Sequence, residues 1–314
     1  MKNLSKIVFL ISHIPNPRIL KRVKILEEDF DITLIYWDRG QPVKEEFEIN
    51  PINTVIRINI SAPLGKPMKR IIPLMKFIFD ALRQLKYEKP NIIHVANIDM
   101  LFIAVLYKKN IDKNIRIIYE VADLPKYSFY TDVNSVKALI SKILQTLEKK
   151  LTSNISKLIL TSPYFWDEYY SKFVSKDKYL FIPNAPFKSL FDKYKGKRVS
   201  GDFTIGFIGS VRYIKQLKML IDAVDEINEE YNKNIKVFIA GSGPGYEEII
   251  EYSINKTFVE IYGPYNYEKE IISLYEKVDC VYSVYDTKLH NVRIALPNRL
   301  YESIVCSIPI IGAK

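Results

Sequence analysis

The chain has 314 residues, of which 48% are hydrophobic and 26% are charged, a composition that excludes an intrinsically disordered protein. Its length suits two α/β lobes better than a single core. The formal net charge of +10 points to nucleic acid, anionic lipid or phosphorylated substrates as partners. Because the sequence has no zinc-ligand spacing and no RNA-binding signature, we expect no nucleic-acid partner.

Only two cysteines occur, Cys280 and Cys306, and both lie in apolar stretches. That number excludes a disulfide framework and favours the reducing cytoplasm. The first apolar run, within residues 6–12, is too short for a signal-peptide core or a membrane span. We therefore expect a cytoplasmic protein whose first apolar run is a buried strand.

Apolar runs of strand length alternate with helical patterns along the first half of the chain, which indicates parallel βαβ architecture. The runs are rich in Ile and Val, as strands covered by helices on both faces are. The predicted strands lie near Lys6–Ser12, Ile32–Trp37, Val55–Ile60, Ile92–Val95, Arg116–Val121, Leu158–Thr161 and Tyr179–Ile182. The predicted helices lie near Pro17–Asp29, Lys66–Lys86, Met100–Lys109, Ser135–Leu151 and Pro163–Phe173.

A polar, Lys-rich stretch over residues 187–202 follows, and we interpret it as a linker between lobes of residues 1–186 and 203–314. Strands and helices then alternate again. The predicted strands lie within residues 204–210, 236–243, 259–264, 278–284 and 308–313, and the predicted helices over Gln216–Glu230, Tyr246–Tyr252, Tyr267–Lys277 and Asn298–Cys306. Because the chain stops just after an apolar strand, where a doubly wound lobe normally continues, we expect either a short lobe or a truncated C-terminal end.

Four motifs follow one another in the second lobe. They are Gly209-Ser-Val-Arg-Tyr-Ile-Lys215, Phe238-Ile-Ala-Gly241-Ser-Gly243-Pro244, Val259-Glu-Ile-Tyr-Gly263-Pro264 and Leu296-Pro-Asn-Arg-Leu-Tyr-Glu302. In this order and spacing they resemble the retaining family 4 glycosyltransferases of the GT-B fold. The resemblance implies two Rossmann-like parallel-sheet lobes facing a cleft, with a nucleotide-sugar donor on the C-terminal side and an acceptor on the N-terminal side.

The resemblance also implies roles for the donor residues. A nucleotide sugar loses a diphosphate, whose developing negative charge must be stabilised. Arg212 and Lys215 lie where a strand gives way to a helix, a position that favours anions, and we expect them to be catalytic there, although solvated basic residues would look the same. Glu302 matches the carboxylate that accepts hydrogen bonds from the donor ribose, and we expect it to open a helix. The full predicted donor set is Gly209, Ser210, Arg212, Lys215, Gly241, Gly243, Pro264, Tyr265, Pro297, Asn298, Arg299 and Glu302.

Two positions depart from the family pattern. Ile294 stands where the family has the first of two glutamates, which commonly addresses the transferred sugar. Ser210 replaces an arginine, for which Arg212 is the nearest substitute. The polar loop of residues 285–293 offers other contacts through Asp286, His290 and Arg293.

The first lobe matches the family less fully, at the ends of its strands. Ligands of open parallel sheets bind beyond the carboxyl ends of the strands, where Glu120 and Asp123 lie. Either carboxylate would orient or deprotonate an acceptor hydroxyl, and carboxylates that only cap a turn are the alternative. His13, Arg18 and His94 complete the predicted acceptor site, with His94 equally compatible with a buried strand position.

The segment Lys66–Lys89 carries seven basic residues against two acids, and its apolar positions fall at helical spacing. These positions include Ile71, Ile72, Leu74, Met75, Ile78, Phe79 and Leu82. The pattern fits a helix that contacts the inner membrane face near a lipid-linked acceptor. Our preferred interpretation is a helix packed on the core with a solvated basic face.

The sequence thus predicts a hexosyltransferase-type enzyme of bacterial glycan or polysaccharide biosynthesis that uses a nucleoside-diphosphate sugar. Its acceptor would be a glycan, a lipid-linked molecule or a protein. We expect no metal and no further cofactor, since the family needs none and no Asp-x-Asp triplet is present. A sugar-nucleotide epimerase and a non-catalytic nucleotide-sugar-binding partner of a transferase remain as alternatives.

Overall fold

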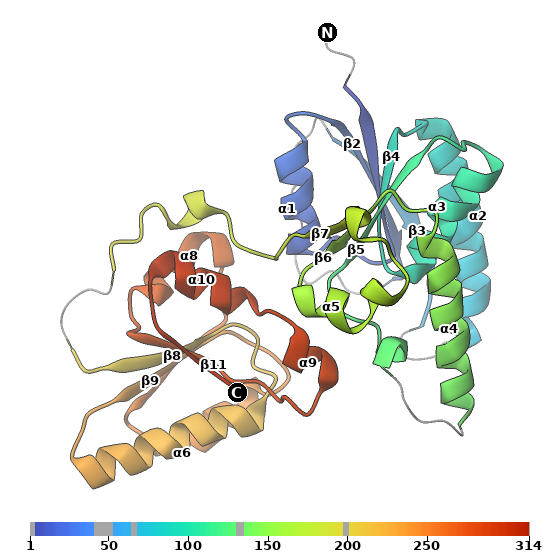
Figure 1. The fold of residues 1–314 in the computed structure, drawn as a ribbon. Coiled ribbons are helices and arrows are strands. Elements are labelled where there is room, and N and C mark those ends of the chain that lie inside the picture. The colour runs from blue at the N-terminus through green and yellow to red at the C-terminus, as the bar shows by residue number, and fades with distance from the viewer. Residues whose placement is uncertain (1–3, 41–52, 64–67, 130–134, 197–200, 314) are drawn as a thin grey trace. The chain divides into compact units, whose positions relative to one another are not determined.

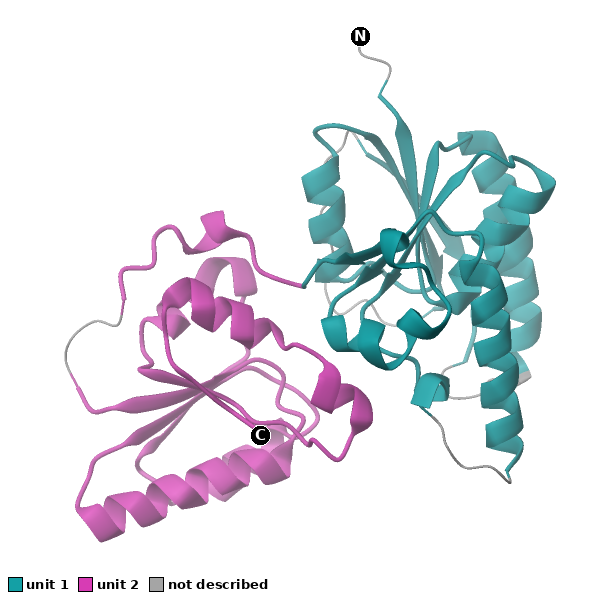
Figure 2. Ribbon diagram, in the orientation of Figure 1, with its two compact units in different colours: residues 1–183 teal, residues 184–314 magenta. Residues whose placement is uncertain are grey.

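The computed structural model describes residues 4–40, 53–63, 68–129, 135–196 and 201–313. The chain divides into two compact units, Met1–Pro183 (unit 1) and Asn184–Lys314 (unit 2), shown in Figure 2. Each unit contains a sheet whose described strand pairs are all parallel. The predicted plan of two Rossmann-like lobes is therefore confirmed.

The sheet of unit 1 has seven strands in the order β3-β2-β1-β4-β5-β6-β7. All of them fall where the sequence predicts strands. They are β1 (Lys6–Ile11), β2 (Asp31–Asp38), β3 (Thr54–Asn59), β4 (Ile92–Ala96), β5 (Arg116–Val121), β6 (Lys157–Leu160) and β7 (Tyr179–Phe181). Because β1 pairs with both β2 and β4, the chain reverses direction across the sheet at β1. This switch point is where open parallel sheets place their ligands.

Helices cover both faces of this sheet (Figure 1). They are α1 (Pro17–Leu26), α2 (Ile71–Glu88), α3 (Ile98–Asn110), α4 (Val136–Thr152) and α5 (Pro163–Glu168), with short 3-10 helices at Met68–Arg70, Lys126–Phe129, Tyr170–Lys172 and Lys176–Lys178. Figure 1 shows α1 on one side of the sheet and α2, α3 and α4 together on the other.

Packing explains this division. Ile19 and Val23 of α1 are buried in one cluster with alternate residues of β1 and β2. On the opposite face, Phe77 of α2 stacks on Trp37 of β2 with ring centroids 4.9 Å apart. Helix α3 lies between α2 and α4 and is buried nearly all round, which explains why its sequence shows no polar stripe.

A buried carboxylate anchors α4 to the sheet. Glu148 accepts hydrogen bonds from the hydroxyls of Tyr119 (2.8 Å), Tyr169 (2.9 Å) and Tyr170 (2.8 Å). Burial raises the pKa of Glu148, and the tyrosine hydrogen bonds oppose that rise. The inward turn of Tyr169 and Tyr170 also ends α5 at Glu168, so the helix predicted over residues 163–173 is too long.

Helix α2 is less buried than our preferred interpretation requires. Its core contacts come from Phe77, Ala81 and Leu85. The expectation that its apolar positions pack on the core is wrong for Ile71, Ile72, Met75 and Phe79, which are all exposed. Lys66, predicted to begin the segment, lies outside the described residues.

The sheet of unit 2 has the strand order β10-β9-β8-β11-β12, so its switch point lies beside β8. The strands are β8 (Thr204–Ile208), β9 (Lys236–Ala240), β10 (Val259–Gly263), β11 (Cys280–Ser283) and β12 (Ile310–Gly312). The helices are α6 (Ile214–Tyr231), α7 (Tyr246–Ser253), α8 (Tyr267–Tyr275), α9 (His290–Ile294) and α10 (Asn298–Cys306). The short helix α9 occupies the end of the stretch that we predicted to be a loop.

Part of the predicted linker packs on unit 2. A 3-10 helix at Lys188–Phe191 places Phe191 in the core of unit 2, 6.1 Å from the ring of Tyr275. Residues 197–200 of the same stretch lie outside the described residues. Within the part of the chain that is described, we find no helix with the length and apolarity needed to cross a bilayer.

Candidate active site

Glycine loops follow three neighbouring strands of unit 2 and pack tightly on one another. The N–H of Gly209 donates to the carbonyl of Ala240 (2.8 Å), and the N–H of Gly241 donates to the carbonyl of Gly263 (2.7 Å). Both Gly209 (φ 137°) and Gly241 (φ 134°) adopt a backbone that other residues rarely tolerate. A Cβ at Gly241 would lie 1.9 Å from the carbonyl oxygen of Gly209. Gly241 therefore allows the loops to stack, a role distinct from the donor contact that we predicted.

The guanidinium of Arg299 lies against the first of these loops. Arg299 is only 6% exposed, stacks over the ring of Phe207 at 3.8 Å and donates to the carbonyl of Tyr282 (3.1 Å). A Cβ at Gly209 would come within 3.1 Å of its Nη2. The start of α10 thus supplies a positive group at the carboxyl end of β8, beside backbone that has no side chain in the way. This arrangement suits an anion.

Glu302 lies one turn further along α10 and is 4% exposed. Its Oε1 accepts from the hydroxyl of Tyr267 (2.7 Å), and its Oε2 accepts from that of Tyr275 (2.8 Å). Burial and the Glu302 charge raise the pKa of Tyr275, and the same causes raise the pKa of Tyr265 to about 12. Because α10 begins at Asn298, Glu302 is its fifth residue, and the expectation that it opens the helix is wrong.

The other predicted donor residues lie on loops and helix starts of unit 2. Arg212 and Ser210 are exposed, and the Nε of Arg212 donates to the Ser210 hydroxyl (3.0 Å). Lys215 is the second residue of α6 and is exposed. Pro297 precedes α10, and Asn298 accepts a hydrogen bond from Asn184 (2.9 Å). Pro264 lies in the loop after β10, and Gly243 packs against the backbone of Val211.

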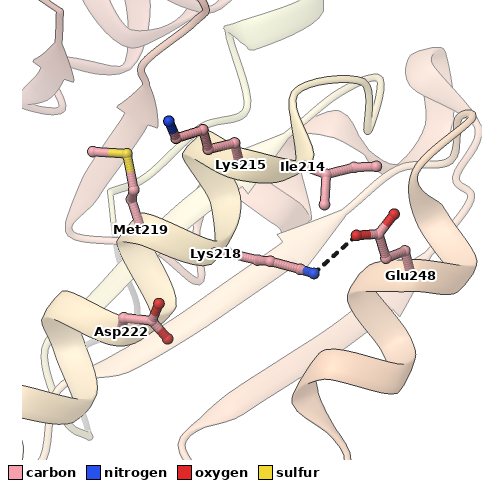
Figure 3. A pocket seen from close by; sticks show the side chains of 6 residues that line it. All are labelled: Ile214, Lys215, Lys218, Met219, Asp222 and Glu248. Atoms are coloured by element: carbon pink, nitrogen blue, oxygen red, sulfur yellow. Dashed lines mark hydrogen bonds and ion pairs between the residues drawn. The ribbon is translucent and has the colours of Figure 1, made fainter.

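An open surface pocket of about 410 Å³ lies beside α6 and α7 (Figure 3). Figure 3 shows the ion pair between Lys218 and Glu248 in it, and Lys215 pointing away from that pair. Its remaining lining comes from Ile214, Met219 and Asp222. Of our predicted site residues only Lys215 lines it, and Arg299 and Glu302 do not. We assign no role to this pocket.

The carboxyl edge of the unit 1 sheet carries a buried charged cluster. Glu120 of β5 receives a hydrogen bond from His94 of β4 (2.9 Å), and both side chains are buried. The Nε atoms of Arg18 and Arg22, one turn apart on α1, lie 3.5 and 3.6 Å from Glu120 Oε1. Burial alone would raise the pKa of Glu120, but the His94 hydrogen bond and the two arginines outweigh it and lower the pKa to about 2.

Two further predicted residues lie at this edge. His13 follows β1, and burial together with the charges of Arg18 and Arg39 lowers its pKa to about 4. Asp123 is exposed in the loop after β5 and interacts electrostatically with Arg18. All five predicted residues of the first lobe, His13, Arg18, His94, Glu120 and Asp123, thus lie at one edge of the sheet.

Several residues of these two sites were absent from the predicted set. Arg22 has a sequence signal, because it stands four residues after Arg18 and so shares its helix face. Tyr267, Tyr275 and Phe207 have none, because they contact Glu302 or Arg299 from other elements. Among the residues that the structure describes, no cluster of His, Cys, Asp and Glu is arranged to hold a metal ion.

Comparison with known proteins adds to this geometry. Residues 202–314 match the family Glycosyl transferases group 1. The succinoglycan biosynthesis protein ExoL of Rhizobium meliloti (strain 1021) is 22% identical over 312 residues, which span 95% of this chain and 73% of that protein.

Two solved structures share the fold over nearly the whole chain. Sucrose-phosphate synthase from Thermosynechococcus elongatus has a TM-score of 0.69 and 14% identity, covering 98% of this chain and 81% of its own. Anabaena Alr3699/HepE in complex with UDP and glucose has a TM-score of 0.63 and 14% identity, and the match covers 99% of this chain and 81% of the HepE chain. The matched domain and these similarities support a glycosyltransferase enzyme with the GT-B fold.

Proposed function

We propose that the protein transfers a sugar, with retention, from a nucleoside-diphosphate sugar bound by unit 2 to an acceptor hydroxyl in glycan or polysaccharide assembly. The observation that carries this proposal is the buried pair on α10, with Arg299 against the bare backbone of Gly209 and Glu302 one turn away. UDP is the first donor nucleotide to test, because the HepE protein of similar fold binds it. We place the reaction in the cytoplasm, where the free thiols of Cys280 and Cys306 would persist.

The donor would contact two residues in the first half of α10, Arg299 and Glu302. Arg299, with Arg212 and Lys215, would neutralise the diphosphate, whose charge grows as the sugar leaves. A carboxylate has about four lone-pair positions, and the tyrosines occupy two of those on Glu302. The remaining positions would accept the ribose hydroxyls.

The acceptor would use the charged edge of unit 1. A carboxyl with a pKa of about 2 is a weak base at neutral pH, so we assign Glu120 to hold His94 and the two arginines in place. Asp123 is exposed at the same edge and is the better candidate to orient an acceptor hydroxyl.

The test measures nucleotide affinity and turnover together. UDP should raise the melting temperature of the protein more than GDP does, and Arg212→Ala and Lys215→Ala should each weaken UDP binding by about tenfold to a hundredfold. Lys218→Ala is a matched control for Lys215→Ala, because Lys218 lies on the same helix, α6, but pairs with Glu248. Unchanged nucleotide affinity and turnover in both variants would refute the donor site.

The reaction products distinguish the alternatives. Incubation with a panel of nucleotide sugars and a membrane lipid extract should yield a glycosylated product and free nucleotide. Isomerised nucleotide sugar would identify an epimerase, and binding without turnover would identify a non-catalytic partner subunit.

A further inference from the structure

Helix α2 exposes a row of large apolar side chains in its first half. Ile72 is 68% exposed, Met75 64% and Phe79 69%, and Ile71 adds a fourth side chain to the row. These residues recur every three or four positions, so they form one stripe on the helix surface. Residues 77, 81 and 85 form the separate face that packs on the sheet.

Helix α4 repeats this arrangement. Val136 is 75% exposed and Leu139 61%, and Ile140 and Ile143 are exposed beside them. The inward contacts of α4 lie mainly further along, at Glu148, Leu151 and Thr152. The apolar surface of α4 is therefore also confined to its first half.

Topology brings the two stripes to the same edge of unit 1. In a parallel sheet a helix that links two strands begins where the first strand ends, so α2 and α4 both begin at the carboxyl edge. Both contact α3, and Figure 1 shows the three helices on one side of the sheet. We use the name apolar edge patch for the exposed residues of both stripes, which lie on either side of α3: Ile71, Ile72, Met75, Phe79, Val136, Leu139, Ile140 and Ile143. It lies at the edge that also holds Glu120 and Asp123.

The charges around this patch have one predominant sign. Lys69, Arg70 and Lys76 accompany the α2 stripe, and Lys137 and Lys142 accompany the α4 stripe. Over residues 69–80 and 136–143 the single acid is Asp80, and Arg83 lies 3.8 Å from it. A second copy of the same patch would be repelled by this positive charge, whereas an anionic surface would be attracted.

We propose that the apolar edge patch docks unit 1 on an anionic lipid bilayer. Exposed Ile, Leu, Met and Phe side chains flanked by Lys and Arg are the combination that binds at the boundary of headgroups and acyl chains. Docking there holds the acceptor edge of unit 1 next to the membrane surface. It does not depend on donor binding by unit 2.

The experiment is sedimentation of the purified full chain with lipid vesicles. One set is phosphatidylcholine alone, and the other contains about one third phosphatidylglycerol. We expect binding to the anionic set only, and we expect it to weaken as NaCl rises from about 0.1 M to about 0.5 M, because salt screens the attraction.

Two variants remove the apolar contacts. Ile72→Gln/Met75→Gln/Phe79→Gln changes α2, and Leu139→Gln/Ile143→Gln changes α4; each should lower the vesicle partition coefficient by about tenfold or more. The control Ile25→Gln/Ile254→Gln changes an exposed residue of α1 and the exposed residue that follows α7, and it should bind vesicles as the wild type does.

Three outcomes overturn the proposal. They are no binding to anionic vesicles, binding that neither patch variant reduces, and a wild-type dimer in analytical ultracentrifugation that both patch variants convert to monomer. Because all changed side chains are exposed, the variants should keep the wild-type melting temperature and its rise with UDP. That rise reports the donor site separately, so failure of membrane docking and failure of the proposed transferase activity are distinguishable.

Discussion

Replacing Glu302 by alanine tests how far the donor site depends on a carboxylate held by two tyrosines. The change leaves the hydroxyls of Tyr267 and Tyr275 without their acceptor. Tyr267 is 38% exposed and can turn its hydroxyl to water, whereas Tyr275 is fully buried. Leaving the Tyr275 hydroxyl buried without an acceptor should lower the free energy of unfolding by about 1–3 kcal/mol, and the lost packing should lower it further. Glu302→Gln keeps the shape and one carbonyl oxygen, so it should cost about 1 kcal/mol or less. Urea unfolding measures both.

The affinity for UDP should not follow the effects on stability. A glutamine offers no charged acceptor to the ribose, and a hydrogen bond to a charged group contributes about 1.5–3 kcal/mol. Glu302→Gln should therefore weaken UDP binding by about tenfold to a hundredfold in titration calorimetry while the fold stays intact. Tyr275→Phe is the control, because it removes one donor to the carboxylate and leaves the carboxylate itself. Wild-type UDP affinity in Glu302→Gln would show that this residue has a structural role alone.

Three further predictions concern other parts of the two sites. Gly241→Ala should destabilise the protein by about 3 kcal/mol or more, because its Cβ would meet the carbonyl of Gly209, whereas Gly196→Ala, with φ 86° and open space, should cost about 1 kcal/mol in the same urea assay. Arg299→Lys loses the planar group that stacks on an aromatic ring, and calorimetry should show UDP affinity reduced by about tenfold. The pKa of Glu120 is lowered from 4.5 to about 2, so the ionised carboxylate adds about 3 kcal/mol to the free energy of unfolding. This stabilisation is fully present above pH 4.5 and is lost as the pH falls through 2. Urea unfolding should show the loss in the wild type and not in Glu120→Gln.

The strands of both sheets could be predicted from the sequence because parallel strands are continuous apolar runs separated by helical patterns. Helix lengths depended on contacts that the pattern does not contain. The end of α5 is set by Tyr169 and Tyr170 turning toward Glu148, a residue of another helix. The exposure of the α2 stripe could not be predicted for a related reason, since apolar residues at helical spacing predict an apolar face but not what covers it.

The site was predictable where a motif is local. The spacing Pro-Asn-Arg-x-x-Glu placed Arg299 and Glu302 one turn apart on α10, as the structure has them. The partners of these side chains come from other elements, with Tyr267 and Tyr275 at the two ends of α8 and Phe207 on β8. Such contacts follow from packing and leave no periodicity in the sequence.

Glu302 and Glu120, the buried carboxylates of the two candidate sites, differ in what surrounds them, and this difference separates their proposed roles. Glu302 is held by neutral phenol hydroxyls, which use part of its hydrogen-bonding capacity and bring no charge. Glu120 accepts a hydrogen bond from His94 and faces Arg18 and Arg22, so its charge is matched inside the protein by two guanidinium groups whose Nε atoms lie within 3.6 Å. A carboxylate whose charge is already matched attracts further donors weakly, whereas one bonded only to neutral groups still attracts them. For this reason we assign ligand binding to Glu302 and the positioning of neighbouring side chains to Glu120.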